Sequence, residues 1–157
     1  MLKWLWLSVL VVALDQGSKY LAEQMLTLHD PVAVMPLLNM TLSHNPGAAF
    51  SFLADAGGWQ RWLFIALAAL VSGVLVVWLR KLSRADAWIA AAVTLVLGGA
   101  IGNLIDRVVH QYVIDFIDVY YKGWHWYTFN VADMAITVGV VVLIADGLFG
   151  RSKDKRP

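Results

Sequence analysis

The chain has 157 residues, of which 60% are hydrophobic and only 15% are charged, and it contains eight tryptophans. This composition is unlike that of an ordinary soluble domain and is typical of a small polytopic membrane protein. The sequence has no cysteine, which excludes disulfides, thiolate nucleophiles and cysteine-ligated metals, and its net charge of +1 gives no reason to expect a nucleic-acid partner.

Four apolar segments approach the roughly 20 residues that a helix needs to cross a bilayer. The first could instead be a secretory signal peptide, because Lys3 precedes an apolar run, but no small-x-small cleavage site follows it. We therefore expect a mainly α membrane protein, a bundle of four transmembrane helices. The predicted helices cover residues 4–22, 59–79, 88–105 and 131–149.

The first helix carries Asp15, Ser18 and Lys19 at positions i, i+3 and i+4, which places them on one face. The acid precedes the base, and this order favours an ion pair within a helix. A pair of Asp15 and Lys19 that only braces the helix and a pair that belongs to a functional site explain the spacing equally well.

The connection of residues 23–58 contains "VAVMPLLNMTLSH", which is rich in β-branched residues with partial alternation and predicts short strands. The motif "SHNPGAAFSF" overlaps the end of this stretch and places Asn45, Pro46 and Gly47 in a turn. We expect a small extracytoplasmic β-structure that lies on the outer membrane surface.

The second helix has no ionisable residue between Arg61 and Arg80, so we assign it to scaffold and lipid contact. In the third helix, Asn103, Asp106 and Arg107 share a face. The motif "GGAIG" just before them has the small-xxx-small spacing that lets helices approach closely. For Asp106 and its neighbour Arg107 we favour a structural ion pair over a reactive acid.

The connection of residues 106–130 contains a second strand signal, "YVIDFIDVYY". If this segment is extended, positions three apart point to opposite faces. Asp115 then turns toward the helices, and Asp118 faces the outer surface, where it is hydrogen-bonded or solvated.

The fourth helix can be capped by Asn130, and Asp133 falls in its first turn, where the helix dipole favours negative charge. An ionisable group at membrane depth is by default a functional-site hypothesis. Asp115 and Asp133 have the most apolar sequence surroundings of all the acids, without a basic neighbour. Two such carboxylates brought together share a proton and can activate a water, which is the chemistry of aspartic proteases.

The lysines and arginines predict how the helices are oriented. With four crossings, one side carries Lys3, the loop "RKLSR" and the tail "GRSKDKRP", whereas the other carries four basic residues against eight acids. By the positive-inside rule both termini are cytoplasmic, and the polar residues of the helices meet at the outer face. We expect one membrane-embedded domain, residues 1–150, and a charged cytoplasmic tail, residues 151–157.

Other chemistries find less support. The sequence has no H-E-x-x-H and no G-x-S-x-G, and its four histidines are scattered singly, so we expect no metal and no cofactor. A dyad of Ser18 or Ser51 with Lys19 is conceivable, but Lys19 already has Asp15 as a partner. From spacing alone, a small proton-coupled transporter ranks ahead of an aspartic protease, and a non-catalytic lipid-binding membrane protein stays open.

Five blocks occur in the order "LDQGSK", "NPGAAFSF", "GGAIGNLIDR", "VIDF" and "FNVADMAIT". Over residues 1 to about 150 they resemble the motif blocks of lipoprotein signal peptidase, the bacterial signal peptidase II. The resemblance implies four transmembrane helices and a β-structure that cradles the substrate. It places the family's catalytic dyad on Asp115 and Asp133, and its supporting residues on Asp15, Lys19, Asn45, Gly47, Asn103, Asp106, Arg107, Asn130 and Ala132.

The resemblance also implies an intramembrane aspartic endopeptidase of the bacterial inner membrane, with its site toward the periplasm. Such an enzyme removes the signal peptide of prolipoproteins by cleavage just before a diacylglyceryl-modified cysteine. The expected partners are these prolipoproteins, membrane lipid and globomycin-type inhibitors, and we expect a monomer. Within the dyad we expect Asp133 to be the more often ionised acid. We also expect Asp118→Asn to keep most of the activity and Asp115→Asn to lose it.

Overall fold

The computed structural model describes residues 1–47 and 57–149. Long helices and a small sheet account for most of these residues, which confirms the predicted fold class. The predicted tail, residues 151–157, and most of the "NPGAAFSF" block lie outside the described residues. The helices are α1 (Leu5–Met25), α2 (Trp59–Lys81), α3 (Ala87–Val109) and α4 (Val131–Phe149), with single 3-10 turns at Leu2–Trp4 and Arg84–Asp86.

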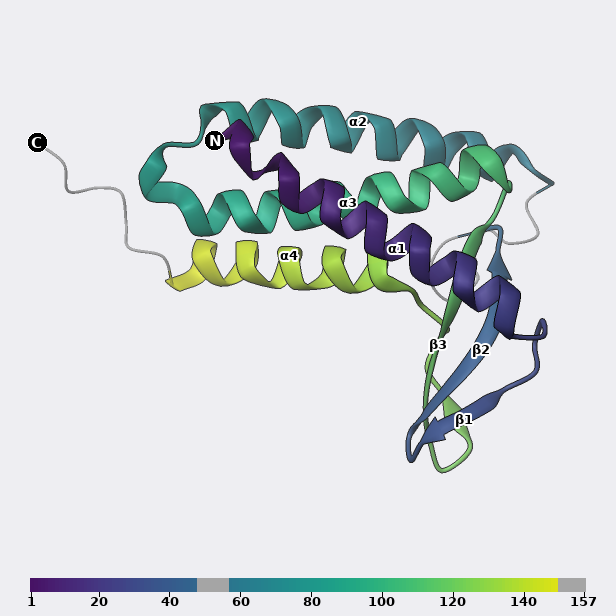
Figure 1. Ribbon diagram of the computed structural model, residues 1–157. Coiled ribbons are helices and arrows are strands. Elements are labelled where there is room, and N and C mark those ends of the chain that lie inside the picture. Colours follow the sequence, from purple (N-terminus) through teal and green to yellow (C-terminus); the bar gives the residue numbers. More distant parts are fainter. Residues whose placement is uncertain (48–56, 150–157) are drawn as a thin grey trace, which may run out of the picture.

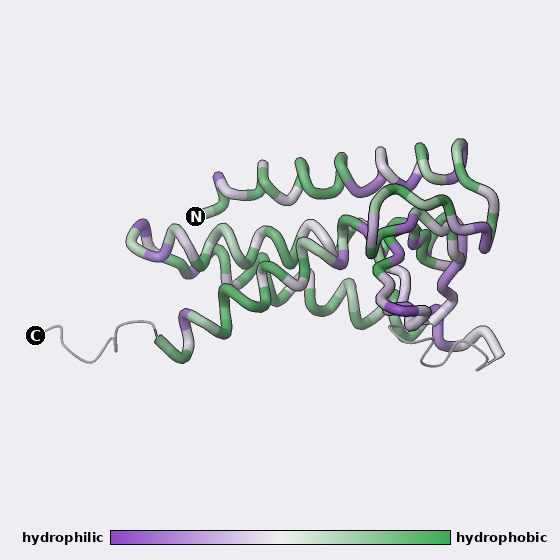
Figure 2. Tube along the Cα trace, turned by 90° about the horizontal axis from the view of Figure 1, so that it is seen from below, coloured by the Kyte–Doolittle hydropathy of each residue, from purple (hydrophilic) through white to green (hydrophobic). Residues whose placement is uncertain are grey.

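Within the described ranges, three helices are long and apolar enough to cross a membrane, namely Trp59–Lys81, Arg84–Val109 and Val131–Phe149. The fourth, α1, has a similar length but carries ionisable residues in its second half. Two of these, Asp15 and Lys19, are only 0% and 1% exposed, so they face the protein and not the lipid. Figure 2 shows mostly hydrophobic helices, with hydrophilic segments gathered at the sheet end and in the α2–α3 connection.

The sheet is antiparallel with the order β1-β2-β3-β4. Figure 1 shows it at one end of the bundle, while the N-terminus and the C-terminal end of α4 lie at the other end. Both predicted strand segments are confirmed. The strands are β1 (Val32–Met35), β2 (Leu38–Asn45), β3 (Val113–Tyr121) and β4 (Trp124–His125).

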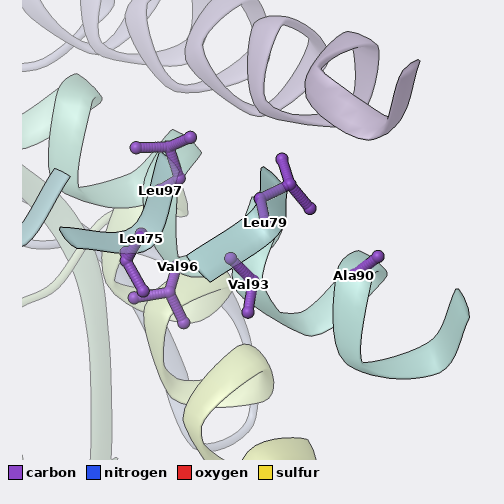
Figure 3. Close-up of a cluster of buried hydrophobic side chains, with 6 residues drawn as sticks. All are labelled: Leu75, Leu79, Ala90, Val93, Val96 and Leu97. Atoms are coloured by element: carbon purple, nitrogen blue, oxygen red, sulfur yellow. The ribbon is translucent and has the colours of Figure 1, made fainter. Parts of the chain in front are cut away.

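The central helix of the bundle is α3, which contacts the other three helices. Its apolar side packs against α2. Buried side chains of both helices form a cluster there, which Figure 3 shows. The cluster consists of Leu75, Leu79, Ala90, Val93, Val96 and Leu97.

Glycines of the "GGAIG" motif bring α1 and α4 close to α3. A Cβ atom at Gly98 would lie 2.8 Å from the Val11 Cβ atom, and one at Gly102 would lie 2.5 Å from Oδ2 of Asp15. Any larger residue at Gly102 would therefore displace a buried carboxylate. The close approach predicted from the small-xxx-small spacing is confirmed.

Candidate active site

Asp115 of β3 and Asp133 of α4 line the same cavity, which has a volume of about 380 Å³. A hairpin brings the two acids together. The chain runs out along β3 and returns to Phe129, whose N–H donates to the Ile117 carbonyl (3.0 Å) and whose carbonyl accepts from the Ile117 N–H (2.9 Å). The next residue, Asn130, begins the approach to α4. Pairing within one hairpin therefore sets where both carboxylates lie.

Asp115 is only 2% exposed, yet both of its carboxyl oxygens have a hydrogen-bond donor. Asn130 Nδ2 donates to Oδ1 (2.6 Å), and Asn45 Nδ2 donates to Oδ2 (3.1 Å). Burial is the main cause that raises the pKa of Asp115, to about 7, and the negative charge of Asp133 adds to it. The two asparagine donors lower this pKa and offset part of the rise.

Asp133 accepts hydrogen bonds from a side chain of α3 and from the backbone of the residue just before α4. Asn103 Nδ2 donates to Oδ1 (2.8 Å), and the Asn130 backbone N–H donates to Oδ2 (3.3 Å). In return, Oδ1 of Asn130 accepts from the backbone N–H of Asp133 (2.9 Å). This reciprocal arrangement is a capping box, and it confirms the predicted cap.

The amide of Asn103 has one orientation that fits its neighbours. Its Oδ1 accepts from Lys19 Nζ (3.1 Å) and from Asn130 Nδ2 (3.2 Å), both of which are donors. The NH₂ group must therefore face Asp133, which accepts from it. In this way a buried lysine controls which end of the amide meets the carboxylate.

Lys19 lies between two buried carboxylates. Its Nζ is 2.8 Å from Oδ2 of Asp15 and 2.8 Å from Oδ2 of Asp106. Asp106 is thus paired with Lys19, and the predicted pair of Asp106 with Arg107 is wrong. Consecutive helix residues point about 100° apart, so Asp106 faces α1 while Arg107 faces α2.

Asp15 and Asp106 also accept hydrogen bonds from backbone N–H groups and from a glutamine. The Ala132 N–H donates to Oδ1 of Asp15 (2.9 Å), which ties α4 to α1. The Ile114 N–H donates to Oδ2 of Asp106 (3.0 Å), which ties the start of β3 to α3. Gln16 Nε2 donates to Oδ1 of Asp106 (2.8 Å). Gln16 belongs to the "LDQGSK" block, but sequence reasoning did not select it.

Arg107 connects α3 to the turn after β2. Its Nη2 donates to the Gly47 carbonyl (3.0 Å), and its guanidinium lies 5.1 Å from the centre of the Phe64 ring of α2. The Gly47 N–H donates to Oδ1 of Asn45 (3.0 Å), as in the predicted turn. This turn presents the Asn45 amide to Asp115.

Asp118 is directed away from the cavity residues, as predicted, and is hydrogen-bonded. It is nevertheless buried, with 3% exposure, so its expected place on the outer surface is wrong. The reason is that side chains of the two neighbouring strands, Asn39 and Thr41 of β2 and His125 of β4, lie against its carboxylate.

One wall of the cavity comes from α2, which the sequence assigned only to scaffold and lipid contact. Phe64, Leu67, Ala68 and Val71 line the cavity together with the acids. Nothing in the sequence could have indicated this, because an apolar side chain that lines a cavity looks the same as one that faces lipid. Among the described residues, no group of three or more histidines and acids could hold a metal ion.

The similarity to known proteins extends over nearly the whole chain. Residues 7–149 match the family Peptidase_A8, described as signal peptidase (SPase) II. The lipoprotein signal peptidase of Pseudomonas syringae pv. tomato is 58% identical in an alignment of 147 positions that covers 92% of this chain and 85% of that protein. The lipoprotein signal peptidase of Pseudomonas putida is 52% identical in an alignment of 158 positions that covers 99% of this chain and 92% of that protein.

A solved structure has the same fold. It is described as a bacterial membrane enzyme structure by the in meso method at 2.3 Å resolution, and its sequence is 31% identical to this chain. The superposition has a TM-score of 0.87 and covers 100% of this chain and 94% of that one.

Proposed function

Because the chain belongs to the signal peptidase II family, aspartic endopeptidases that process bacterial prolipoproteins, we propose that Asp115 and Asp133 are its catalytic dyad. One observation carries this proposal: the two acids line a single cavity, and asparagine amides hold each of them. Two carboxylates that share a proton provide both a base and an acid for peptide hydrolysis.

The protonation of the dyad follows from its surroundings. Asp133 lies at the N-terminus of α4, where the helix dipole favours the ionised form, so it accepts a proton from the attacking water. Asp115, whose pKa is raised to about 7, holds the shared proton and donates it toward the scissile carbonyl oxygen. As the tetrahedral intermediate collapses, the proton on Asp133 passes to the leaving amine, and a hydroxyl of the intermediate returns a proton to Asp115, which restores the dyad.

The other predicted residues support the dyad, either by direct hydrogen bonds to its carboxylates or by holding the elements that carry it. Asn45, Asn103 and Asn130 donate to the two carboxylates. Ion pairs and backbone hydrogen bonds connect α1, α3 and α4 next to these amides, and a further hydrogen bond holds the turn after β2. The residues that form these contacts are Asp15, Lys19, Gly47, Asp106, Arg107 and Ala132.

The substrate is a prolipoprotein that is cut just before its diacylglyceryl-modified cysteine. The apolar side chains of Phe64, Leu67 and Val71 in the cavity wall suit a substrate that is largely apolar. Membrane lipid surrounds the site, and a globomycin-type peptide inhibits the enzyme by occupying the same cavity. The enzyme acts as a monomer.

The test is incubation of the purified protein with a lipidated preprolipoprotein, followed by mass analysis. We expect one cut on the amino side of the modified cysteine, blocked by globomycin. Binding without cleavage would favour a non-catalytic lipid-binding protein. A proton-coupled transporter needs polar groups through the whole membrane depth, whereas α4 has no ionisable residue between Asp133 and Asp146.

The protein lies in the inner membrane with both termini in the cytoplasm and the dyad toward the periplasm. Reporter fusions after Lys81 and after Lys155 should therefore read cytoplasmic, and a fusion within residues 54–58 should read external, because basic loops stay inside. Paired reporters that are active on opposite sides of the membrane measure this. A cytoplasmic reading for residues 54–58 would place the dyad at the wrong leaflet for a lipidated substrate.

The pH dependence of cleavage follows from Asp115. Its pKa is raised to about 7, so the last shared proton is lost above that pH and both acids are then ionised. We expect kcat/KM, which reports the free enzyme, to fall as the pH rises above about 7. Steady-state rates across the pH range, in one detergent and with one substrate, give the profile. An activity that stays constant well above this pH would contradict a proton held on Asp115.

A further inference from the structure

Asp118 is a second buried carboxylate on β3, and it is not among the described residues that line the cavity. Nδ1 of His125 lies 2.9 Å from Oδ1 and 3.1 Å from Oδ2 of Asp118. Thr41 Oγ1 donates to Oδ2 (3.0 Å), and Asn39 Nδ2 lies 3.4 Å from it. One carboxylate thus joins β3 to β2 on one side and to β4 on the other.

The link to β4 matters because β4 is short. It has two residues, His125 and Trp124, which pair with Tyr120 and Tyr121. The His125 ring also stacks on Tyr120, with 5.5 Å between the ring centres. The returning chain then continues to Asn130, which donates to Asp115 and caps α4. The bond between Asp118 and His125 therefore adds to the backbone pairing of Phe129 with Ile117 in holding the segment that leads to Asn130.

The link to β2 leads to the other amide. A register shift lies between Met40 and Ser43, so β2 has one more residue than β3 in this interval. Asp118 and Asp115 are on opposite faces of β3. Because the extra residue of the bulge reverses the face to which the following residues of β2 point, Thr41 can contact Asp118 while Asn45, further along, contacts Asp115. Asp118 thus fixes the register of the strand that carries Asn45.

We propose that Asp118 and His125 are a positioning pair for the catalytic dyad. The pair ties β3 to the two segments whose asparagines hold Asp115, and it acts through Asn45 and Asn130 without touching the substrate. This inference rests on the proposed dyad of Asp115 and Asp133. It assigns a role to the β-structure besides any contact with substrate or membrane.

Two substitutions of His125 separate its hydrogen bond from its packing. His125→Phe keeps a ring that can stack on Tyr120 but removes the donor to Asp118. His125→Asn keeps a donor near the position of Nδ1. We expect His125→Phe to lower kcat about 10-fold with KM changed less than about twofold, and His125→Asn to recover kcat to within about threefold of wild type. His29→Asn, an exposed histidine, is the matched control and should match wild type.

The pH profile gives a signature that a loss of stability would not produce. Asn45 and Asn130 lower the pKa of Asp115, so weaker contacts with them let this pKa rise above its value of about 7. In His125→Phe the upper limb of the pH profile should therefore move to higher pH, whereas in His125→Asn it should stay in place.

A double-mutant cycle tests whether the two residues act as one unit. Asp118→Ala breaks the links to both β2 and β4, so it should lower kcat at least as much as His125→Phe, which breaks only the link to β4. The double variant should lose little more than Asp118→Ala alone, because the link that His125→Phe removes is then already broken. Asp118→Asn, which still offers an oxygen to His125 and Thr41, should keep most of the activity.

The outcomes separate this inference from the proposed function. If Asp115→Asn is inactive while His125→Phe has the kcat and pH profile of wild type, the positioning pair is refuted and the dyad stands. A change in KM alone, or equal losses in His125→Phe and His125→Asn, would also refute the pair. If Asp115→Asn is active, the dyad itself fails. Should His125→Phe not fold, Asp118→Ala takes its place: its kcat must then be clearly lower than that of Asp118→Asn, and equal kcat values for these two variants would refute the pair.

Discussion

Asp115→Asn and Asp133→Asn should each abolish prolipoprotein cleavage, with a loss of about a thousandfold or more. Each acid must change its protonation state during the reaction, and an amide of the same shape cannot do so. The substituted side chains keep nearly the same volume, so insertion and folding should be preserved. Mass analysis of one lipidated substrate, with each purified variant at the same pH, measures the loss.

A matched control for these variants is Asp30→Asn. Asp30 is an exposed acid in the connection between α1 and β1. Its substitution removes one negative charge without changing the cavity, so wild-type activity is expected. Thermal unfolding of all three variants shows whether they are folded. Full activity in either folded dyad variant would refute the assignment of the catalytic acids.

Lys19→Met should destabilise the fold strongly and also remove activity. Lys19 is 1% exposed and lies 2.8 Å from both Asp15 and Asp106, so its loss leaves two buried carboxylates without a counter-ion. Removal of one partner from a buried ion pair costs about 3 to 5 kcal/mol. Activity falls as well, because Asn103 loses the donor that fixes its amide and can then present its oxygen to Asp133.

Unfolding of the purified protein in detergent micelles measures the change in stability. Lys81→Met, at the exposed lysine that ends α2, is the control and should behave like wild type. Adding Asp15→Asn and Asp106→Asn to Lys19→Met removes the uncompensated charges, so it should restore much of the stability but not the activity. A Lys19→Met variant as stable as wild type would show that these carboxylates do not need the lysine.

The sequence by itself determined the features that depend on local spacing. Long apolar runs predicted the helices, and the i, i+4 spacing predicted the pair of Asp15 and Lys19. The i, i+3 spacing predicted the cap of Asn130 on α4. These contacts form within one element, whose geometry is the same in any fold. The ordered motif blocks indicated the family and the candidate residues, which the structure brings together around one cavity.

Contacts between elements were decided only by the tertiary structure. Asp106 is paired with Lys19 of α1 and not with its sequence neighbour, because the rotation of α3 against α1 determines which side chains meet. Asp118 is buried because side chains of β2, from a distant segment, and of β4, from the same hairpin, surround it, and a bulge in β2 sets which residues of β2 face it. Phe64 lines the cavity although α2 reads as a lipid-facing helix. In a membrane, lipid is as apolar as the protein core, so hydrophobicity alone does not tell which face of a helix is turned inward.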